Sequence, residues 1–164
     1  MSLRVEIIPC RTDNYSYMCI DNKNNAFVVD PSEFMPVDEF IKTNNLKLKY
    51  ILNTHHHFDH VGGNIELKEK YGAKIVGNKN DKDRIPGIDI CLIEGEFFKF
   101  NEYKAEIIDI PGHTIGHIAF HIQSENIVFT GDTLFSLGCG RIFEGTPEMM
   151  YQSLNKLKNL PENT

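Results

Sequence analysis

Short runs of apolar and alternating residues recur along the chain and predict a protein rich in strands. Alternation over residues 5–8 and 15–20 is followed by an apolar run at 26–29, and the polar segment Asn22–Asn25 between the last two is typical of a hairpin turn. The apolar run Tyr50–Leu52 predicts a buried strand. Further strands are expected at residues 73–76, 97–100, 104–110, 117–122 and 127–130.

Apolar residues at helical spacing predict three helices between these strands. They fall at residues 36–45, at residues 64–71 after a pair of glycines, and from Pro147 to Leu160, where the pattern is that of an amphipathic helix. Residues 78–87 are polar and contain a Pro-Gly pair, so we expect a loop there rather than a linker between domains. The order of elements favours the α/β (α+β) class, with packed sheets flanked by helices.

Composition narrows the classes of protein to consider. A chain of 164 residues suits a single domain over residues 1–164, and 41% hydrophobic with 24% charged residues excludes a mostly disordered chain. A net charge of −6 makes a nucleic-acid partner an unfavoured expectation. No apolar run is long enough to span a bilayer, and the first residues lack a secretory signal, so we expect no membrane partner.

The four cysteines form no C-x-x-C pair and are interpreted as reduced thiols. The expected compartment is therefore cytoplasmic, with the mitochondrion as the alternative.

A cluster of histidines follows the strand predicted at Tyr50–Leu52. His55 and His57 are two residues apart, so in extended backbone they lie on one side, and Asp59 and His60 follow as the chain turns. Imidazole and carboxylate groups are good ligands for zinc or iron. A solvated polar loop is the alternative, but this spacing directly after a strand favours a metal site. His56, between two expected ligands, should point elsewhere.

Two more donors follow predicted strands. His113 lies in a Pro-Gly turn, and Asp132 follows an apolar run ending in Thr130. One such residue is weak evidence, but three strand-end donor sites in one short chain favour a shared metal. His117 and His121 lie on one face of a predicted strand and are interpreted as structural, with His117 a candidate hydrogen-bond partner of a ligand or of its loop.

Four segments now point to a known family. The chain resembles the metallo-β-lactamase superfamily, and within it the glyoxalase II family of hydroxyacylglutathione hydrolases. The H-x-H-x-D-H spacing is specific to the superfamily, and the GDTLF and GCGR-x-FEGT stretches are specific to the glyoxalase II branch. The matching segments, which span almost the whole chain, are IIPCRTDNYSYMCID, THHHFDHVGGN, PGHTIGH and FTGDTLFSLGCGRIFEGTPEMMYQSL.

The resemblance implies a four-layer αβ/βα sandwich with two divalent metal ions at one edge. Zinc is the metal we expect, with iron or manganese as alternatives. Arg141 stands where the family has a basic residue that contacts the glutathione part of the substrate, and Phe143 stands where a tyrosine often contributes a hydroxyl. The implied metal ligands are His55, His57 and His113 for the first ion, Asp59 and His60 for the second and Asp132 bridging both, with Asp59 and Asp132 also taking part in catalysis.

One departure from the family affects the second ion. In the family, a further histidine follows the last helix of this region and completes the second site, whereas this chain stops at Thr164. The resemblance therefore predicts a C-terminally truncated chain that lacks the family's helical domain. It also predicts a second metal site that lacks one ligand and is only partly occupied.

The implied activity is hydrolysis of S-2-hydroxyacylglutathione thioesters, such as S-lactoylglutathione, to glutathione and lactate by a metal-bound hydroxide. A thiolate leaves readily, so no dedicated general acid is required. Two alternatives remain: a glutathione persulfide dioxygenase with a single iron, or a metal-binding fragment with little activity. The expected partner is a small-molecule glutathione thioester, and the oligomeric state stays open.

Overall fold

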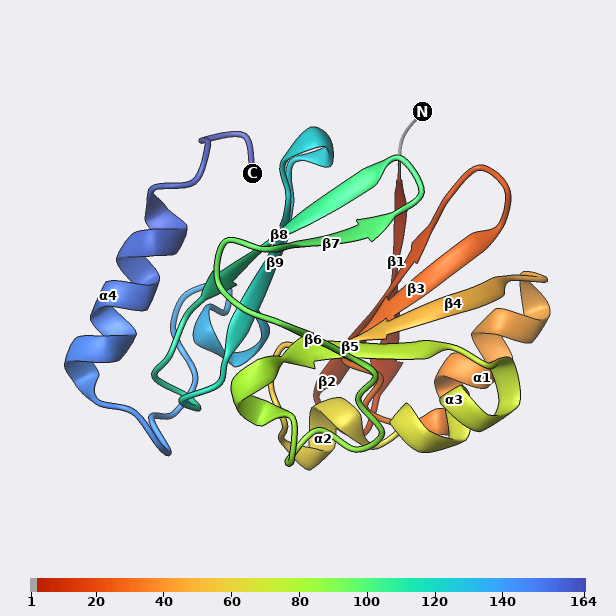
Figure 1. Cartoon of the computed structure of the whole chain (residues 1–164), viewed down its shortest axis with the longest axis horizontal. Coiled ribbons are helices and arrows are strands. Elements are labelled where there is room, and N and C mark those ends of the chain that lie inside the picture. The colour runs from red at the N-terminus through yellow and green to blue at the C-terminus, as the bar shows by residue number, and fades with distance from the viewer. Residues whose placement is uncertain (1–2) are drawn as a thin grey trace.

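Two β-sheets lie face to face in the computed structural model, which describes residues 3–164 (Figure 1). The first sheet has six strands in sequence order. β1 to β3 pair antiparallel, and β3 to β6 pair parallel. Its strands are β1 (Arg4–Cys10), β2 (Asn14–Ile20), β3 (Asn25–Val29), β4 (Lys47–Leu52), β5 (Lys74–Asn78) and β6 (Ile90–Leu92).

The second sheet is antiparallel and has the order β10-β9-β8-β7. A large apolar core joins the two sheets, with Phe27 from the first and Ile107 and Phe120 from the second fully buried in it. The strands of the second sheet are β7 (Phe97–Phe100), β8 (Tyr103–Asp109), β9 (Ile118–Ile122) and β10 (Ile127–Phe129).

Helices cover the two outer faces. α1 (Phe34–Thr43) and α3 (Asn64–Tyr71) pack on the first sheet through a second apolar cluster, and α4 (Pro147–Lys158) packs on the second sheet through a third (Figure 1). The layers therefore run helix, sheet, sheet, helix. The predicted four-layer αβ/βα sandwich is confirmed, and burial on both faces explains why central strands such as β3 are continuous apolar runs.

The structure differs from the predicted elements where those elements are short. The segment 78–87, predicted as a loop, begins with the single 3-10 turn η1 (Lys79–Asp81), and a one-turn helix α2 (Phe58–Val61) follows the histidine cluster. β6 was not predicted; it is a short edge strand with no fully buried side chain, so it lacks the apolar run that marked the equally short β10. His117 lies just before β9 rather than within the strand, whereas His121 lies in it.

The pairing of the strands brings the ends of several of them to one edge of the sandwich. β3 and β4 are parallel, with Val29 opposite Leu52, so the residues that follow each strand emerge side by side. The two sheets are tied together at this edge, because the Ile118 amide donates a 2.9 Å hydrogen bond to the Thr54 carbonyl. Segments distant in sequence are thereby held next to one another before any side chain is considered.

A buried carboxylate links α1 to α3 on the outer face of the first sheet. Asp38 accepts hydrogen bonds from Lys42 at 2.7 Å, from Lys70 at 2.6 Å and from the Tyr71 hydroxyl at 2.5 Å. Burial raises the pKa of Asp38, but these three donors more than offset it, so the pKa lies well below its usual range.

A carboxyl whose pKa falls on folding stabilises the protein above its unfolded-state pKa of about 3.9, and this stabilisation is lost as the pH falls below that value. We therefore expect the free energy of unfolding, measured with urea, to fall more steeply between about pH 5 and pH 2 for the unaltered chain than for Asp38→Asn. Parallel curves for the two proteins would contradict this role.

Candidate metal centre

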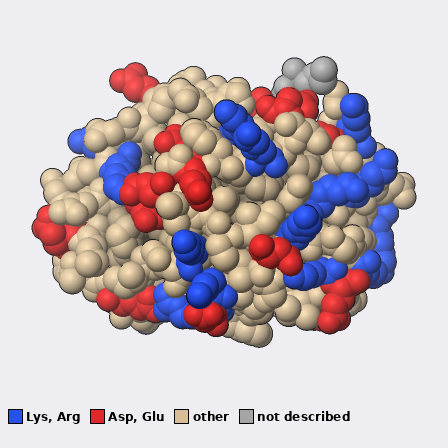
Figure 2. Space-filling model, in the orientation of Figure 1, with Lys and Arg blue, Asp and Glu red and all other residues tan. Residues whose placement is uncertain are grey.

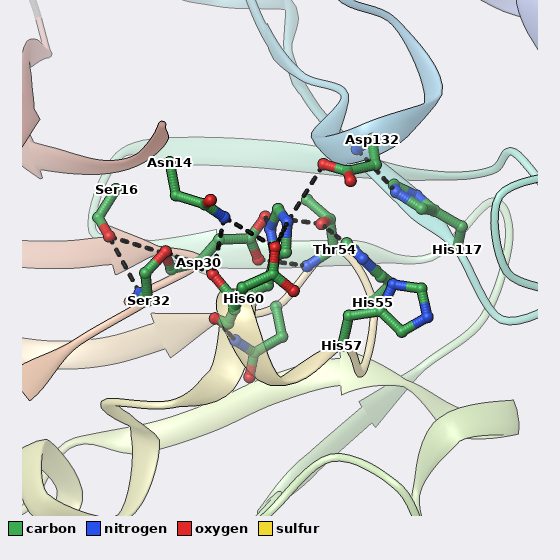
Figure 3. A network of polar contacts seen from close by, with 12 residues as sticks. Asn14, Ser16, Asp30, Ser32, Thr54, His55, His57, His60, His117 and Asp132 are labelled. Carbon is green, nitrogen blue, oxygen red and sulfur yellow. Dashed lines mark hydrogen bonds and ion pairs between the residues drawn. The ribbon is translucent and has the colours of Figure 1, made fainter. Parts of the chain in front are cut away.

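Histidine and aspartate side chains gather at the edge where strands of both sheets end (Figure 3). β4 leads into the loop that carries His55 and His57, and the short helix α2 that follows carries His60. From the second sheet, His113 follows β8, and Asp132 lies in the 3-10 turn η3 (Gly131–Thr133) directly after β10. The residues singled out as metal ligands thus arise from the ends of strands in two sheets.

His55, His57 and His113 form a first group of donors. Each offers a ring nitrogen, and the three atoms lie within 4.8 Å of one another. Their ring centroids are 4.7 to 5.0 Å apart, with the planes roughly perpendicular, so the rings face a common point rather than stack. This is the arrangement that a cation held by three imidazoles requires.

Hydrogen bonds fix which nitrogen of each ring carries the proton. The Thr54 hydroxyl donates its only proton to Asp30 at 2.6 Å, so toward His55 Nδ1, 3.1 Å away, that hydroxyl can only accept. His113 Nδ1 likewise donates to the Arg141 carbonyl at 2.6 Å. In both rings Nε2 is left with a lone pair, which is the form that binds a metal.

Burial favours the neutral form of His55 and His57. The pKa of His55 is lowered well below its usual value by burial and by the neighbouring imidazoles His117, His60 and His57. The pKa of His57 is lowered for the same two reasons. Neutral imidazole is the ligand form, so a metal ion need not compete with a bound proton at His55.

His60 lies in a second group of donors that is rich in carboxylates. Its Nδ1 donates to Asp30 Oδ2 at 3.0 Å, and its Nε2 lies 3.1 Å from Asp132 Oδ1 and 3.7 Å from Asp59 Oδ2. Burial lowers the pKa of His60, but Asp30 and Asp132 more than offset this and raise the pKa to about 10. In the metal-free chain a proton on His60 therefore supplies the positive charge that the carboxylates demand.

Asp132 faces both groups. Its Oδ1 lies toward His60 (Figure 3). Its Oδ2 lies 3.4 Å from His113 Nε2. The turn that presents Asp132 is held by its backbone amide, which donates to His117 Nε2 at 3.1 Å. Gly131 before it has φ +46°, and a Cβ there would meet the Thr54 hydroxyl at 2.4 Å, so only glycine fits this approach.

The donor set has the orphaned atoms that a metal would satisfy. Among the described residues of this donor set, His55 Nε2 is buried without a partner, whereas His60 Nε2 has only the Asp132 and Asp59 carboxylates beside it. A buried polar atom left unpaired costs about 1–3 kcal/mol. Three imidazoles and several carboxylates around these atoms fit a divalent cation, because such ions prefer nitrogen and oxygen ligands.

Comparison with known proteins decides the family. The family model described as the metallo-beta-lactamase superfamily matches residues 11–164. The chain belongs to the metallo-β-lactamase superfamily. Membership and the His/Asp cluster together indicate a site for divalent metal.

Two curated relatives carry the name hydroxyacylglutathione hydrolase, which confirms the resemblance to that branch. The chain is 58% identical to the protein from Pelagibacter ubique and 47% identical to that from Methylococcus capsulatus, over 99% of its own length in each case. It covers 68% and 64% of those proteins, so it spans about two thirds of their length.

Solved structures agree on the fold of this metallo-β-lactamase superfamily member. The BLEG-1 B3 metallo-beta-lactamase superposes with a TM-score of 0.89 at 22% identity, covering 97% of this chain and 88% of that one. ETHE1 from Myxococcus xanthus gives a TM-score of 0.86 at 27% identity, covering 100% and 73%. A di-iron-bound form of TTHA1623 gives 0.79 at 26% identity, covering 94% and 85%.

Two residues that support the site were not predicted. Asp30, at the end of β3, holds both His60 and the Thr54 backbone amide, the latter at 2.8 Å. Asn14, at the start of β2, donates to the Asp59 carboxylate at 2.9 Å and to its carbonyl at 3.1 Å. Asp30 follows an apolar strand, as His113 and Asp132 do, and that shared position is the signal that could have revealed it.

The two expected substrate-binding residues lie beside the first group of donors. The Phe143 ring, 62% exposed, meets His57 and His113 with centroids 5.6 and 5.2 Å away. It borders a cavity of about 510 Å³ that Asp132 also lines. Arg141 is exposed, and the contact that the structure gives it is through its carbonyl to His113 rather than through its guanidinium.

Surface features do not alter this assignment. On the face shown in Figure 2, basic side chains are more frequent toward the right, over α1, α3 and β4, with acidic ones among them. Within residues 3–164 no helix has the length and apolar character needed to cross a bilayer. All four cysteines, each in the described part of the chain, are free.

Asp30 offers a test of the second donor group. Asp30→Asn removes the charge that orients His60, so we expect zinc affinity on the His60 side to fall about tenfold or more. The three-histidine group, which Asp30 reaches only through Thr54, should lose less affinity. Zinc titration against a competing chelator would resolve the two. Equal weakening of both binding events, or of neither, would contradict the assigned contact.

Proposed function

We propose that this chain hydrolyses S-2-hydroxyacylglutathione thioesters, such as S-lactoylglutathione, in a metal-dependent reaction. The observation that carries the proposal is the convergence of His55, His57 and His113 on one point, with Asp132 reaching from there to a second donor group. Identity of 58% to a hydroxyacylglutathione hydrolase supports the substrate class.

We propose zinc as the metal, with iron or manganese able to replace it, and two ions as the full complement. His55, His57 and His113 would hold the first ion, while Asp59 and His60 would hold the second, and Asp132 would reach both. The first ion should bind more tightly, since the lowered pKa values of His55 and His57 favour their neutral, metal-binding form. At His60 an incoming ion must displace a strongly held proton.

When bound, divalent ions would polarise a carbonyl group and make hydroxide available near neutral pH. The chain's own residues supply the orientation. Asp132, fixed by its amide bond to His117, presents one oxygen toward each donor group. Asp59, held by Asn14, is placed at the open side of the cavity, where it can orient an attacking water by hydrogen bonding.

The leaving group explains why no further acid is needed. A thiol has a pKa of about 8.5, so its thiolate departs without protonation, whereas an alkoxide would require a proton donor. The glutathione portion carries carboxylates, for which the exposed guanidinium of Arg141 is a suitable partner. Free thiols at all four cysteines suit a reducing compartment such as the cytosol, where we place the activity.

The direct test follows hydrolysis of S-lactoylglutathione by the zinc-loaded chain through loss of thioester absorbance. We expect turnover that chelation removes and added zinc restores, and a fall of at least about a hundredfold in His57→Ala and Asp132→Ala, since each removes a donor. Oxygen consumption with glutathione persulfide, in place of thioester hydrolysis, would instead favour a mononuclear iron dioxygenase.

Arg141→Ala tests the substrate contact separately. A guanidinium that binds the glutathione carboxylates equally in the ground and transition states should, when removed, raise KM more than it lowers kcat. Steady-state kinetics with S-lactoylglutathione measure both constants. A loss confined to kcat would show that Arg141 acts at the reacting thioester and would contradict this assignment.

A further inference from the structure

Four side chains form a polar cluster beside the metal centre that none of the steps above uses. We call it the Asp81 cluster; its members are His56, Asp81, Arg84 and Glu144. His56 is the histidine that the sequence left between two ligands, and Glu144 belongs to the FEGT stretch. Asp81 and Arg84 come from the segment 78–87, which was predicted to be a plain loop.

Asp81 is the buried centre of the cluster. Its side chain is 0% exposed, and it contacts His56 Nδ1 at 3.1 Å and the Arg84 guanidinium at 2.5 Å. Gly116 packs directly on this carboxylate, because a Cβ there would lie 2.1 Å from Asp81 Oδ1. The second glycine of the PGHTIGH segment is therefore required by Asp81 and not by a metal ligand.

Glu144 fastens a second loop to the same centre. One carboxylate oxygen accepts from Arg84 at 2.5 Å and lies 3.6 Å from His56 Nε2. The other accepts the Ile115 amide at 2.8 Å. Glu144 thus joins the loop that carries Arg141 and Phe143 to the turn that carries His113.

Arg84 is the member that holds two carboxylates at once. One terminal nitrogen of its guanidinium contacts Asp81 and the other contacts Glu144. A planar guanidinium can make both contacts in a fixed geometry, whereas a lysine ammonium acts as a single point charge. Removing Arg84 would leave a buried carboxylate and a loop carboxylate facing each other without a cation between them.

We propose that Arg84 and Asp81 are positioning residues that fix the loop at residues 141–144 against the histidine loop at residues 55–57. They act through Glu144 and His56, and so hold the Phe143 ring against His57 and the Arg141 carbonyl against His113 Nδ1. When this fastening is lost, the loop is still held to the His113 turn by backbone hydrogen bonds, such as that from the Phe143 amide to the His113 carbonyl at 3.2 Å, but it is no longer held to the histidine loop. The loop then moves more freely against both ligands. Bound metal is then released faster, and the glutathione-binding side is mispositioned.

The chain contains a closely matched control. On the outer face of the first sheet, Lys68 pairs with Asp89 at 2.6 Å, and the other Asp89 oxygen accepts the Ile75 amide at 2.9 Å. Side-chain exposures are 34% and 32% there, against 38% and 28% for Arg84 and Glu144. Lys68→Met therefore removes an ion pair as exposed as that of Arg84 with Glu144, on the outer face of the first sheet and outside the Asp81 cluster.

The experiment measures zinc transfer from the loaded chain to a chromogenic chelator, pyridylazoresorcinol, for Arg84→Met, Arg84→Lys, Glu144→Gln and Lys68→Met. We expect zinc release to be about tenfold faster in Arg84→Met, less accelerated in Arg84→Lys and unchanged in Lys68→Met. Tryptic cleavage after Arg141 of the metal-free chain should accelerate in the same order. Glu144→Gln, which keeps an acceptor for Ile115, repeats the test if Arg84→Met does not fold.

Zinc release and tryptic cleavage need no thioester substrate, so they test the proposal independently of the proposed function. Only the steady-state kinetics of Arg84→Met with S-lactoylglutathione rest on that function. In these kinetics, Arg84→Met should raise KM more than it lowers kcat. Zinc release and cleavage at wild-type rates in both Arg84→Met and Glu144→Gln would overturn the proposal. Equal acceleration in Arg84→Met and Lys68→Met would also overturn it, because the effect would then follow global stability.

Discussion

Buried imidazole lone pairs that face one another are the constraint on which the site depends. The opposite nitrogen of each ring donates a hydrogen bond, His55 Nδ1 to Thr54 and His113 Nδ1 to the Arg141 carbonyl, so both Nε2 lone pairs are directed into the site. There His113 Nε2 lies 2.9 Å from His57 Nδ1, and His55 Nε2 is buried without a hydrogen-bond partner. Burial favours the uncharged form of His55 and lowers its pKa. A cation is the group that satisfies such an arrangement without protonating the rings.

The fold supplies this constraint through residues that would not touch the metal. Asp30 fixes the ring of His60 and, through Thr54, the tautomer of His55. His117 receives the amide of Asp132, and burial beside His113 lowers its pKa to about 3, so it stays a neutral acceptor. Positions on four different strand ends are thereby coupled, and a change in one hydrogen bond displaces a ligand on another segment.

The sequence predicted the ligands better than their supports, for a physical reason. His55, His57, Asp59 and His60 lie within six residues, so local spacing after a strand was enough to bring them into one group of candidates. The supporting residues instead meet partners that are far away in the sequence. Asp30 contacts His60 30 positions away, Asn14 contacts Asp59 45 positions away, and Arg84 contacts Glu144 60 positions away. No periodicity carries information at such separations.

The helices and strands were likewise predicted only where the local sequence shows a clear apolar pattern. Most strands and the helix from Pro147 were predicted from their apolar pattern. In contrast, η1 and α2 are single turns, and β6 is an edge strand with no fully buried side chain, so none of the three shows such a pattern. The family resemblance implied roles for the side chains of Arg141 and Phe143 toward a substrate. The contact that the structure shows for Arg141 is made by its backbone carbonyl, which side-chain chemistry does not predict.

Anomalous diffraction at the zinc edge, from crystals of the chain soaked in zinc salts, tests the central claim most directly. The account predicts a strong peak at the point shared by His55 Nε2, His57 Nδ1 and His113 Nε2, with Asp132 adjacent. Rings in the same positions with no anomalous peak between them at saturating zinc would contradict it.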